Sequence, residues 1–224
     1  MTRVAVVVPV YGNAPTLGPL TGRLAAALEG RDWRLRFVID ASPDDSAGVA
    51  RSLAAVEPRI AVTDLAVNVG QHRALARGLA DEPAADVWVC LDADLQDPPE
   101  AVPHLLDRLA AGEVGAVFAG RRGSYESRPR RLTGTLHRRI AARLTGLPPD
   151  AGAFLAMGPG VRQAVLTAVG SGAPSVVLAV ARAGEPVTSV PVARDVRPEG
   201  RSAWTGRARL RQSLSSLTWA VRRR

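Results

Sequence analysis

The chain has 224 residues, which is enough for one large domain or two small ones with a substantial core. Its 29 basic side chains are all arginines, since the sequence contains no lysine, and they give a net charge of +8. This charge predicts an anionic partner, whether phosphate, nucleic acid or acidic membrane, with a generally basic solvated surface as the simpler alternative. A lone cysteine, Cys90, excludes a disulfide within the chain, and no apolar run approaches the roughly 18 residues of a membrane span. We therefore expect a reduced, cytoplasmic protein, with contact to the inner face of the membrane left open.

The first half of the chain alternates short, β-branched apolar runs with helical patterns. The apolar runs predict strands at Arg3–Val8, Leu35–Asp40, Ile60–Leu65, Val87–Leu91 and Val114–Ala119. The patterns between them predict helices at Pro15–Leu28, Asp44–Val56, Gln71–Ala80 and Pro98–Ala111. We expect Asp44 and Asp45 to cap the second of these helices. Strands separated by helices of this length favour right-handed βαβ units, and so an α/β fold with a mostly parallel sheet flanked by helices.

The second half is less regular, and it begins with a basic loop. The predicted elements there are an amphipathic helix at Leu132–Leu144, a turn and short strand within Pro148–Met157, helices at Pro159–Val169 and Ser175–Ala183, and a strand at Val187–Val192. No internal repeat or linker interrupts this stretch, so residues 1–193 are predicted to form a single domain.

Residues 194–224 form a separate basic tail that carries nine arginines. Four apolar side chains recur in it at helical spacing: Leu210, Leu214, Leu217 and Val221. This pattern predicts an amphipathic C-terminal helix. Such a helix either docks its apolar stripe on the protein or lies in a membrane interface, as basic helices that carry tryptophan often do.

Polar residues cluster where the predicted strands end and loops begin. These loops are Pro9–Asn13, Asp40–Asp45, Asn68–Arg73 and Asp92–Asp97. In a parallel sheet they share one edge, where open α/β sheets bind their ligands. The sequence lacks the glycine-rich loops of dinucleotide-binding and P-loop folds, so a nucleotide site assembled from several strand ends is expected instead.

The richest of these loops places Asp92, Asp94 and Asp97 within six residues, directly after a buried strand and before Pro98-Pro99. Carboxylates so close together repel one another unless a cation or several donors share the site. Oxygen ligands of this kind suit Mg²⁺ or Mn²⁺ carrying a substrate diphosphate. A solvated turn rich in helix-capping aspartate is the alternative.

Taken in order, these motifs resemble the family 2 glycosyltransferases, most closely the polyprenol-phosphate sugar transferases similar to dolichol-phosphate mannosyltransferase and bactoprenol glucosyltransferase. The matching segments are Val8–Tyr11, Val38–Asp45, Asn68–Gln71, Asp92–Glu100, Pro148–Phe154 and Arg197–Ser202. The resemblance covers nearly the whole chain. It implies a GT-A fold, a nucleotide-diphosphate sugar donor, Mg²⁺ or Mn²⁺ as cofactor and inversion at the anomeric carbon.

The resemblance also implies a role for individual residues. Pro9, Tyr11, Asp40, Gln71, Asp92 and Ser202 would bind the nucleotide, Asp94 and Gln96 would hold the metal, Asp92, Asp94 and Arg197 would serve catalysis, and Arg121, Arg131 and Asp150 would face the acceptor. The leading hypothesis is therefore hexose transfer to a polyprenyl phosphate. A lipid phosphate is largely ionised at neutral pH, so it attacks without a protein base and needs only positioning by arginine.

Several positions depart from the family pattern, and they keep two other hypotheses open. The departures lie in the nucleotide and acceptor pockets: Asn13, Ile39, Ala41, Ala153, Leu155 and Ala203. They favour, as the second hypothesis, a soluble transferase that acts on a small-molecule hydroxyl or amine, for which Asp150 would be the base. The third hypothesis is a degenerate transferase that is kept as a binding protein.

The remaining candidates are interpreted structurally. His72, His104 and His137 lack metal-ligand spacing, and Cys90 is expected to be a buried apolar side chain. No nucleic-acid-binding module accompanies the arginines, so nucleic acid is not an expected partner. Homo-oligomerisation stays open.

Overall fold

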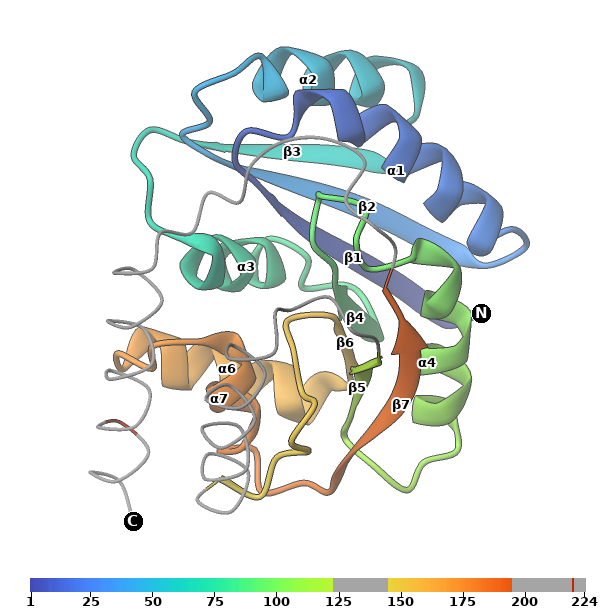
Figure 1. The fold of residues 1–224 in the computed structure, drawn as a ribbon, viewed down its shortest axis with the longest axis vertical. Helices are drawn as coiled ribbons and strands as arrows, with labels where there is room; N and C mark the ends of the chain where they lie inside the picture. The colour runs from blue at the N-terminus through green and yellow to red at the C-terminus, as the bar shows by residue number, and fades with distance from the viewer. Residues whose placement is uncertain (123–144, 195–218, 220–224) are drawn as a thin grey trace.

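A computed structural model describes residues 1–122, 145–194 and 219, and the account that follows concerns these residues (Figure 1). Within them a seven-stranded sheet is formed by β1 (Arg3–Val10), β2 (Asp32–Asp40), β3 (Ile60–Leu65), β4 (Val87–Cys90), β5 (Ala116–Arg122), β6 (Leu155–Met157) and β7 (Val187–Ala193). The helices are α1 (Ala14–Ala27), α2 (Ser46–Val56), α3 (Gln71–Ala80), the 3₁₀ turn η1 (Pro99–Ala101), α4 (Val102–Ala110), α6 (Pro159–Gly170) and α7 (Val176–Val180).

The strand order is β3-β2-β1-β4-β6-β5-β7, and β6 alone among these strands runs against its neighbours. The other six strands therefore end at the same edge, and the segment that leads into β6 starts there. This topology brings every polar loop predicted from the sequence to one edge of the sheet.

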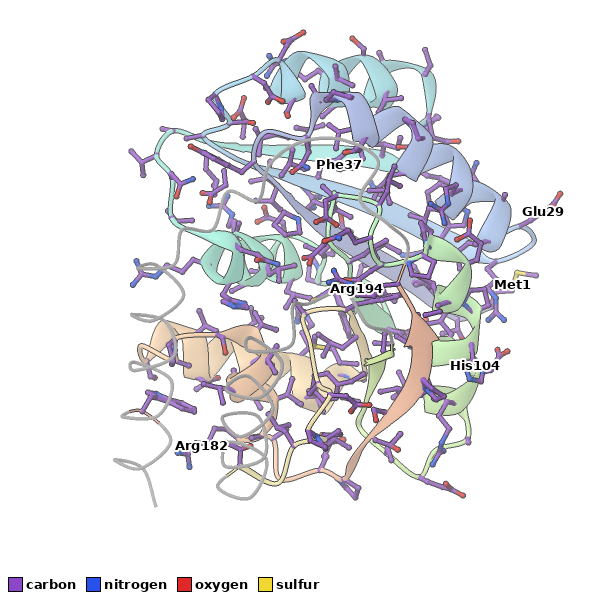
Figure 2. The ribbon with its side chains drawn as sticks, viewed as in Figure 1. Met1, Glu29, Phe37, His104, Arg182 and Arg194 are labelled. Carbon is purple, nitrogen blue, oxygen red and sulfur yellow. The ribbon has the colours of Figure 1, made fainter. Side chains whose placement is uncertain are left out.

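Helices cover both faces of the sheet (Figure 1). On one face, α1, α2 and α4 enclose a core that includes Phe37 (Figure 2). On the other, α3, α6 and α7 enclose a second core. The alternation of β1 explains the division, because Val4, Val6, Val8 and Val10 face the first core whereas Ala5 and Val7 face the second.

Helix α3 lies unusually close to the sheet. A Cβ at Gly78 would collide with the side chains of Val7 and Val38. The missing side chain lets α3 approach β1 and β2. This close approach matters for the site because α3 begins with Gln71 at the carboxyl edge.

Most predicted elements are confirmed to within a few residues. One differs in kind, because the helix expected from Pro98 begins as a 3₁₀ turn and becomes α-helical only at Val102. Another is shorter than predicted, because the helix expected over Ser175–Ala183 is limited to Val176–Val180. The predicted helix at Leu132–Leu144 lies outside the described residues.

The structure describes two residues of the C-terminal tail, Arg194 and Trp219, and Trp219 packs against the second core. The Arg182 guanidinium lies 4.7 Å from the centroid of the Trp219 ring, a cation–π distance. At this residue the tail contacts the protein itself.

Candidate active site

The loop after β4 carries the acidic motif, and burial alternates along it. Asp92, Asp94 and Gln96 are partly exposed, whereas Ala93, Leu95 and Asp97 are buried. Leu95 has φ 58°, a left-handed conformation that is uncommon outside glycine. Strained residues of this kind persist where their surroundings fix them, and they concentrate at functional sites.

Three elements that are distant in sequence fix this loop. The Gln71 side-chain amide, at the start of α3, donates a 2.5 Å hydrogen bond to Asp92 Oδ1. The Thr16 hydroxyl, in the first turn of α1, donates to the Ala93 carbonyl at 2.6 Å. Arg194, directly after β7, pairs with Asp97 through a 2.7 Å contact. The polar side chains of the loop are thus presented from an anchored backbone.

Asp94 and Gln96 are coupled within the loop, because Asp94 Oδ1 accepts a 3.1 Å hydrogen bond from the Gln96 backbone N–H. In the part of the chain that the structure describes, no three His, Cys, Asp or Glu side chains come together as a metal site. Mg²⁺ and Mn²⁺ at phosphate-transfer sites commonly take one or two protein oxygens and complete their shell with phosphate and water. The donor set therefore fits a metal ion that binds together with a diphosphate, and not one held by protein alone.

Asp40, at the end of β2, is only 3% exposed. Its Oδ1 accepts from the Val69 backbone N–H at 2.7 Å, and its Oδ2 accepts from the Gly70 N–H at 2.9 Å. Asn68 closes the arrangement by donating its side-chain amide to the Asp40 carbonyl at 3.0 Å. The carboxylate thus holds the loop that leads to Gln71, and contact with a nucleobase stays a prediction for this residue.

Pro9 and Tyr11, both expected at the nucleoside, lie in different environments. Pro9 is buried within β1, where it is paired with Val38 of β2. Tyr11 lies just beyond the strand and is 43% exposed. Of the two side chains, that of Tyr11 is accessible to a ligand.

Asp44 joins the loops that follow β1 and β2. It accepts hydrogen bonds from the Ser42 and Ser46 hydroxyls and from the backbone N–H groups of Ala14 and Ser46. Partial burial raises the pKa of its carboxyl, but these donors outweigh that effect and lower the pKa to about 2. The predicted capping of α2 is confirmed for Asp44, whereas Asp45 makes no side-chain cap and Asp44 also holds the start of α1.

Asp150 lies in the segment that leads into β6, with its carboxylate against the Cα of Gly120 in β5. Its Oδ1 is buried and has no hydrogen-bond partner within the described part of the chain. A buried carboxylate oxygen without a donor is costly, and a catalytic role is one reason for which such a group is retained. Ala153 and Leu155, the nearby departures from the family pattern, are buried in the second core.

The other predicted acceptor and loop residues cannot be placed in the same way. The backbone of Arg121 lies in β5, paired with Val192 of β7. Its side chain lies outside the described residues, as do Arg131, Arg197 and Ser202.

The structural interpretations of His72 and Cys90 are confirmed. Burial lowers the pKa of His72 to about 4, so its ring is neutral at physiological pH. Burial, together with the nearby Asp92 carboxylate, raises the pKa of the Cys90 thiol and keeps it protonated.

Two contributors to the site, Thr16 and Arg194, are absent from the sequence prediction. Thr16 belongs to a helix, and no local pattern marks its contact with Ala93, which is 77 residues away. Asp97 lies within the acidic motif, but its partner could be found only from the position of β7 beside the loop.

Among the described helices, none has both the length and the apolar character needed to cross a membrane.

Comparison with known proteins gives relatives that include two bacterial sugar transferases. The chain is 37% identical over 160 residues to an undecaprenyl-phosphate 4-deoxy-4-formamido-L-arabinose transferase of Enterobacter sp. (strain 638), covering 68% of this chain and 47% of the relative. It is 35% identical over 150 residues to the transferase of the same name from Shewanella sediminis, covering 64% and 44%. The match therefore spans less than half of either relative.

Solved structures are similar over almost the whole chain. A mannosyltransferase from Pyrobaculum calidifontis, in complex with GDP-mannose and Mn²⁺, aligns with a TM-score of 0.70 at 20% identity, covering 98% of this chain and 64% of that one. The glucosyl-3-phosphoglycerate synthase of Mycobacterium tuberculosis, with Mn²⁺, UDP and glucosyl-3-phosphoglycerate, gives 0.70 at 20% identity, covering 99% and 80%. The predicted GT-A fold is confirmed.

The match to a family model is more specific than the likeness of fold. The model of glycosyl transferase family 2 matches residues 5–159, from β1 to the start of α6. This stretch includes the loops after β1, β2, β3 and β4, and so the carboxylates Asp40, Asp92 and Asp94. The chain therefore belongs to glycosyl transferase family 2.

Proposed function

We propose that this chain is an inverting, metal-dependent glycosyltransferase that moves a hexose from a nucleotide-diphosphate sugar to a polyprenyl phosphate. The observation that carries the proposal is the anchored loop after β4, which presents Asp92, Asp94 and Gln96 at the carboxyl edge of the sheet. The names of the relatives, which act on undecaprenyl phosphate, support the choice of acceptor.

In this proposal the donor lies across the carboxyl edge. Tyr11 contacts the nucleoside, Asp92 the ribose or sugar, and Asp94 with Gln96 the metal ion on the diphosphate. When bound, the metal supplies positive charge to the diphosphate as it leaves the sugar. Gln71 holds Asp92 in one rotamer through their 2.5 Å hydrogen bond, so the carboxylate is oriented before the donor arrives.

The transfer needs no protein base when the acceptor is a phosphate. An acceptor phosphate oxygen forms a bond to the anomeric carbon while the bond from that carbon to the diphosphate oxygen breaks, and the nucleoside diphosphate departs. Arg121, Arg131 and Arg197 are assigned by family position to hold the two anionic groups, and Ser202 to bind the nucleotide.

A second function is favoured by one observation, the buried Asp150 Oδ1 that lacks a hydrogen-bond donor among the described residues. A carboxylate within hydrogen-bond reach of an acceptor hydroxyl or amine can serve as its general base. The acceptor would then be a small-molecule hydroxyl or amine, whose proton passes to Asp150 as its oxygen or nitrogen bonds to the anomeric carbon.

The first test is calorimetric titration with UDP-, GDP- and dTDP-sugars, each with Mn²⁺, Mg²⁺ or EDTA. Metal-dependent binding of one nucleotide class is expected, and Asp94→Ala should abolish its metal dependence. Failure of every nucleotide to bind would overturn the proposal and favour a degenerate binding protein.

The acceptor is tested by turnover with the donor so identified. Undecaprenyl phosphate in detergent is compared with soluble hydroxyl and amine acceptors, and each assay is repeated with Asp150→Asn. Turnover of the lipid phosphate that Asp150→Asn leaves within about threefold supports the first function. Turnover of soluble acceptors alone supports the second function, provided that Asp150→Asn lowers this turnover by the ~10²–10⁴-fold that a general base contributes.

A further inference from the structure

One contact at the site joins two charges that are almost removed from water. The Asp97 side chain is 2% exposed and that of Arg194 is 16% exposed, with Arg194 Nε 2.7 Å from Asp97 Oδ1. Arg194 lies beside the loop after β4 in Figure 2. The contact spans 97 residues and joins the end of β7 to the end of the acidic loop.

Stability alone does not account for such a pair. Removing two charges from water costs about as much as their attraction returns, and apolar side chains of similar size often serve stability as well or better. A buried ion pair has a second effect, because its defined geometry fixes the relative position of the two backbone segments that carry it.

Each member of the pair lies next to residues that are assigned to the site. Asp97 directly follows Gln96, and Gln96 in turn donates its backbone N–H to Asp94. Displacement of Asp97 therefore moves Gln96 and, through that hydrogen bond, Asp94. Arg194 lies three residues before Arg197 in the sequence. The pair thus links the metal-binding end of the loop to the root of the segment that carries Arg197 and Ser202.

The other two anchors act at the opposite end of the loop. Gln71 and Thr16 hold Asp92 and Ala93. Arg194 holds the far end, beyond the left-handed Leu95. Loss of Arg194 would leave the Asp92 end of the loop held while weakening the hold on the Gln96 end, so it should affect metal binding more than it affects the ribose or sugar contact.

We propose that Arg194 is a positioning residue which, through Asp97, sets the metal-binding geometry of Asp94 and Gln96 and ties it to the base of the C-terminal segment. The inference rests on the proposed function, because it assumes a metal ion at Asp94 and Gln96. Residues that orient metal ligands typically change metal affinity by about 10–100-fold when they are removed.

The chain offers a matched control. Arg23 and Glu100 form a two-pronged ion pair of similar length, 2.7 and 2.8 Å, between α1 and the 3₁₀ turn just after the same loop. Its side chains are 33% and 53% exposed. Glu100→Gln therefore removes an Arg–carboxylate pair three residues beyond Asp97 without leaving a buried charge.

The experiment measures Mn²⁺ affinity with the nucleoside diphosphate of the identified donor, by calorimetry, and thermal unfolding without metal. The variants are Arg194→Met, Arg194→Lys, the double variant Asp97→Leu/Arg194→Met, and Glu100→Gln. We expect Arg194→Met to weaken Mn²⁺ binding about tenfold or more, Arg194→Lys to restore part of it, and Glu100→Gln to stay within twofold of the wild type.

The double variant separates positioning from stability. It removes both charges of the pair, so its unfolding temperature should recover towards that of the wild type. Mn²⁺ binding should nevertheless remain about tenfold weaker than in the wild type, because the ion pair that holds this end of the loop is missing. Recovery of Mn²⁺ affinity together with stability, or wild-type affinity in Arg194→Met, overturns the inference while leaving the proposed function intact. A wild-type chain that binds no Mn²⁺ with any nucleotide overturns both.

Discussion

The hydroxyl of Thr16 donates a 2.6 Å hydrogen bond to the carbonyl of Ala93, the residue between the two carboxylates of the acidic loop. Thr16 is 7% exposed, and its hydroxyl also lies 3.0 Å from the Asn13 carbonyl in the loop after β1. One side chain in the first turn of α1 therefore joins two of the loops that make up the carboxyl edge.

Replacing Thr16 by valine should reveal this link. The substitution keeps the shape of the side chain but leaves the Ala93 carbonyl without its donor, which should lower the free energy of unfolding by about 1–3 kcal/mol. Chemical denaturation measures this directly. Thr21→Val is the matched control, because among the described residues the Thr21 hydroxyl bonds the Leu17 carbonyl one turn earlier in the same helix and no other group. An equal effect of the two substitutions would show that the Ala93 contact has no special weight.

Asp40→Asn tests whether this carboxylate mainly holds the loop after β3. Both oxygens of Asp40 accept backbone N–H groups, and an asparagine amide would turn a donor toward one of them. We expect the free energy of unfolding to fall by about 1–3 kcal/mol and the Val69 and Gly70 amides to exchange hydrogen faster. Asp64→Asn, at an exposed ion pair with Arg51, should change stability by less than about 0.5 kcal/mol. Unchanged exchange at Val69 and Gly70 would contradict the holding role.

The parts of the fold that were predicted well are those with a strong local signal. The run Val4–Val8 is apolar on both faces, and such a run in a chain of alternating elements indicates a central parallel strand. From strands of this kind the common edge follows by topology, and with it the placement of Tyr11, Asp40, Gln71 and Asp92 at that edge. The antiparallel orientation of β6 could not be predicted, because the side-chain pattern of a three-residue strand does not indicate which way the strand runs.

The contacts within the site were harder to predict, since they depend on pairs that are distant in sequence. Family position predicts a nucleobase contact for Asp40, and the structure adds that its oxygens accept the Val69 and Gly70 amides. Nothing in the local sequence shows that a carboxylate will be turned toward a neighbouring loop. The same holds for Arg194, whose neighbours in the sequence do not mark it as the partner of Asp97.

His72 predicts a pH dependence of stability. Its folded pKa is about 4, below the ordinary 6.5, because burial disfavours the charged ring. Between pH 6.5 and 4 the unfolded chain therefore binds a proton that the folded chain does not, so the free energy of unfolding falls as the pH falls through this window. His72→Gln should flatten the fall in denaturation experiments across this range. His104→Gln, on the exposed side of α4, controls for removing a histidine. An unaltered pH profile in His72→Gln would contradict the buried neutral ring.

The close approach of α3 to the sheet predicts that an alanine will lower the free energy of unfolding at Gly78 in α3 but raise it at Gly22 in α1. At Gly78 an added methyl group would meet Val7 and Val38 in the second core, so Gly78→Ala should lower the free energy of unfolding by about 1–3 kcal/mol. At Gly22, on the exposed side of α1, nothing lies within 4 Å of an added Cβ, and Gly22→Ala should raise stability by about 0.5–1 kcal/mol.

Because α3 also carries Gln71, a shift of the helix in Gly78→Ala should loosen the contact with Asp92. The nucleotide titrations should then show weaker binding for Gly78→Ala than for Gly22→Ala, even at temperatures where both variants are fully folded. Equal binding would mean that the start of α3 stays in place when its middle is displaced.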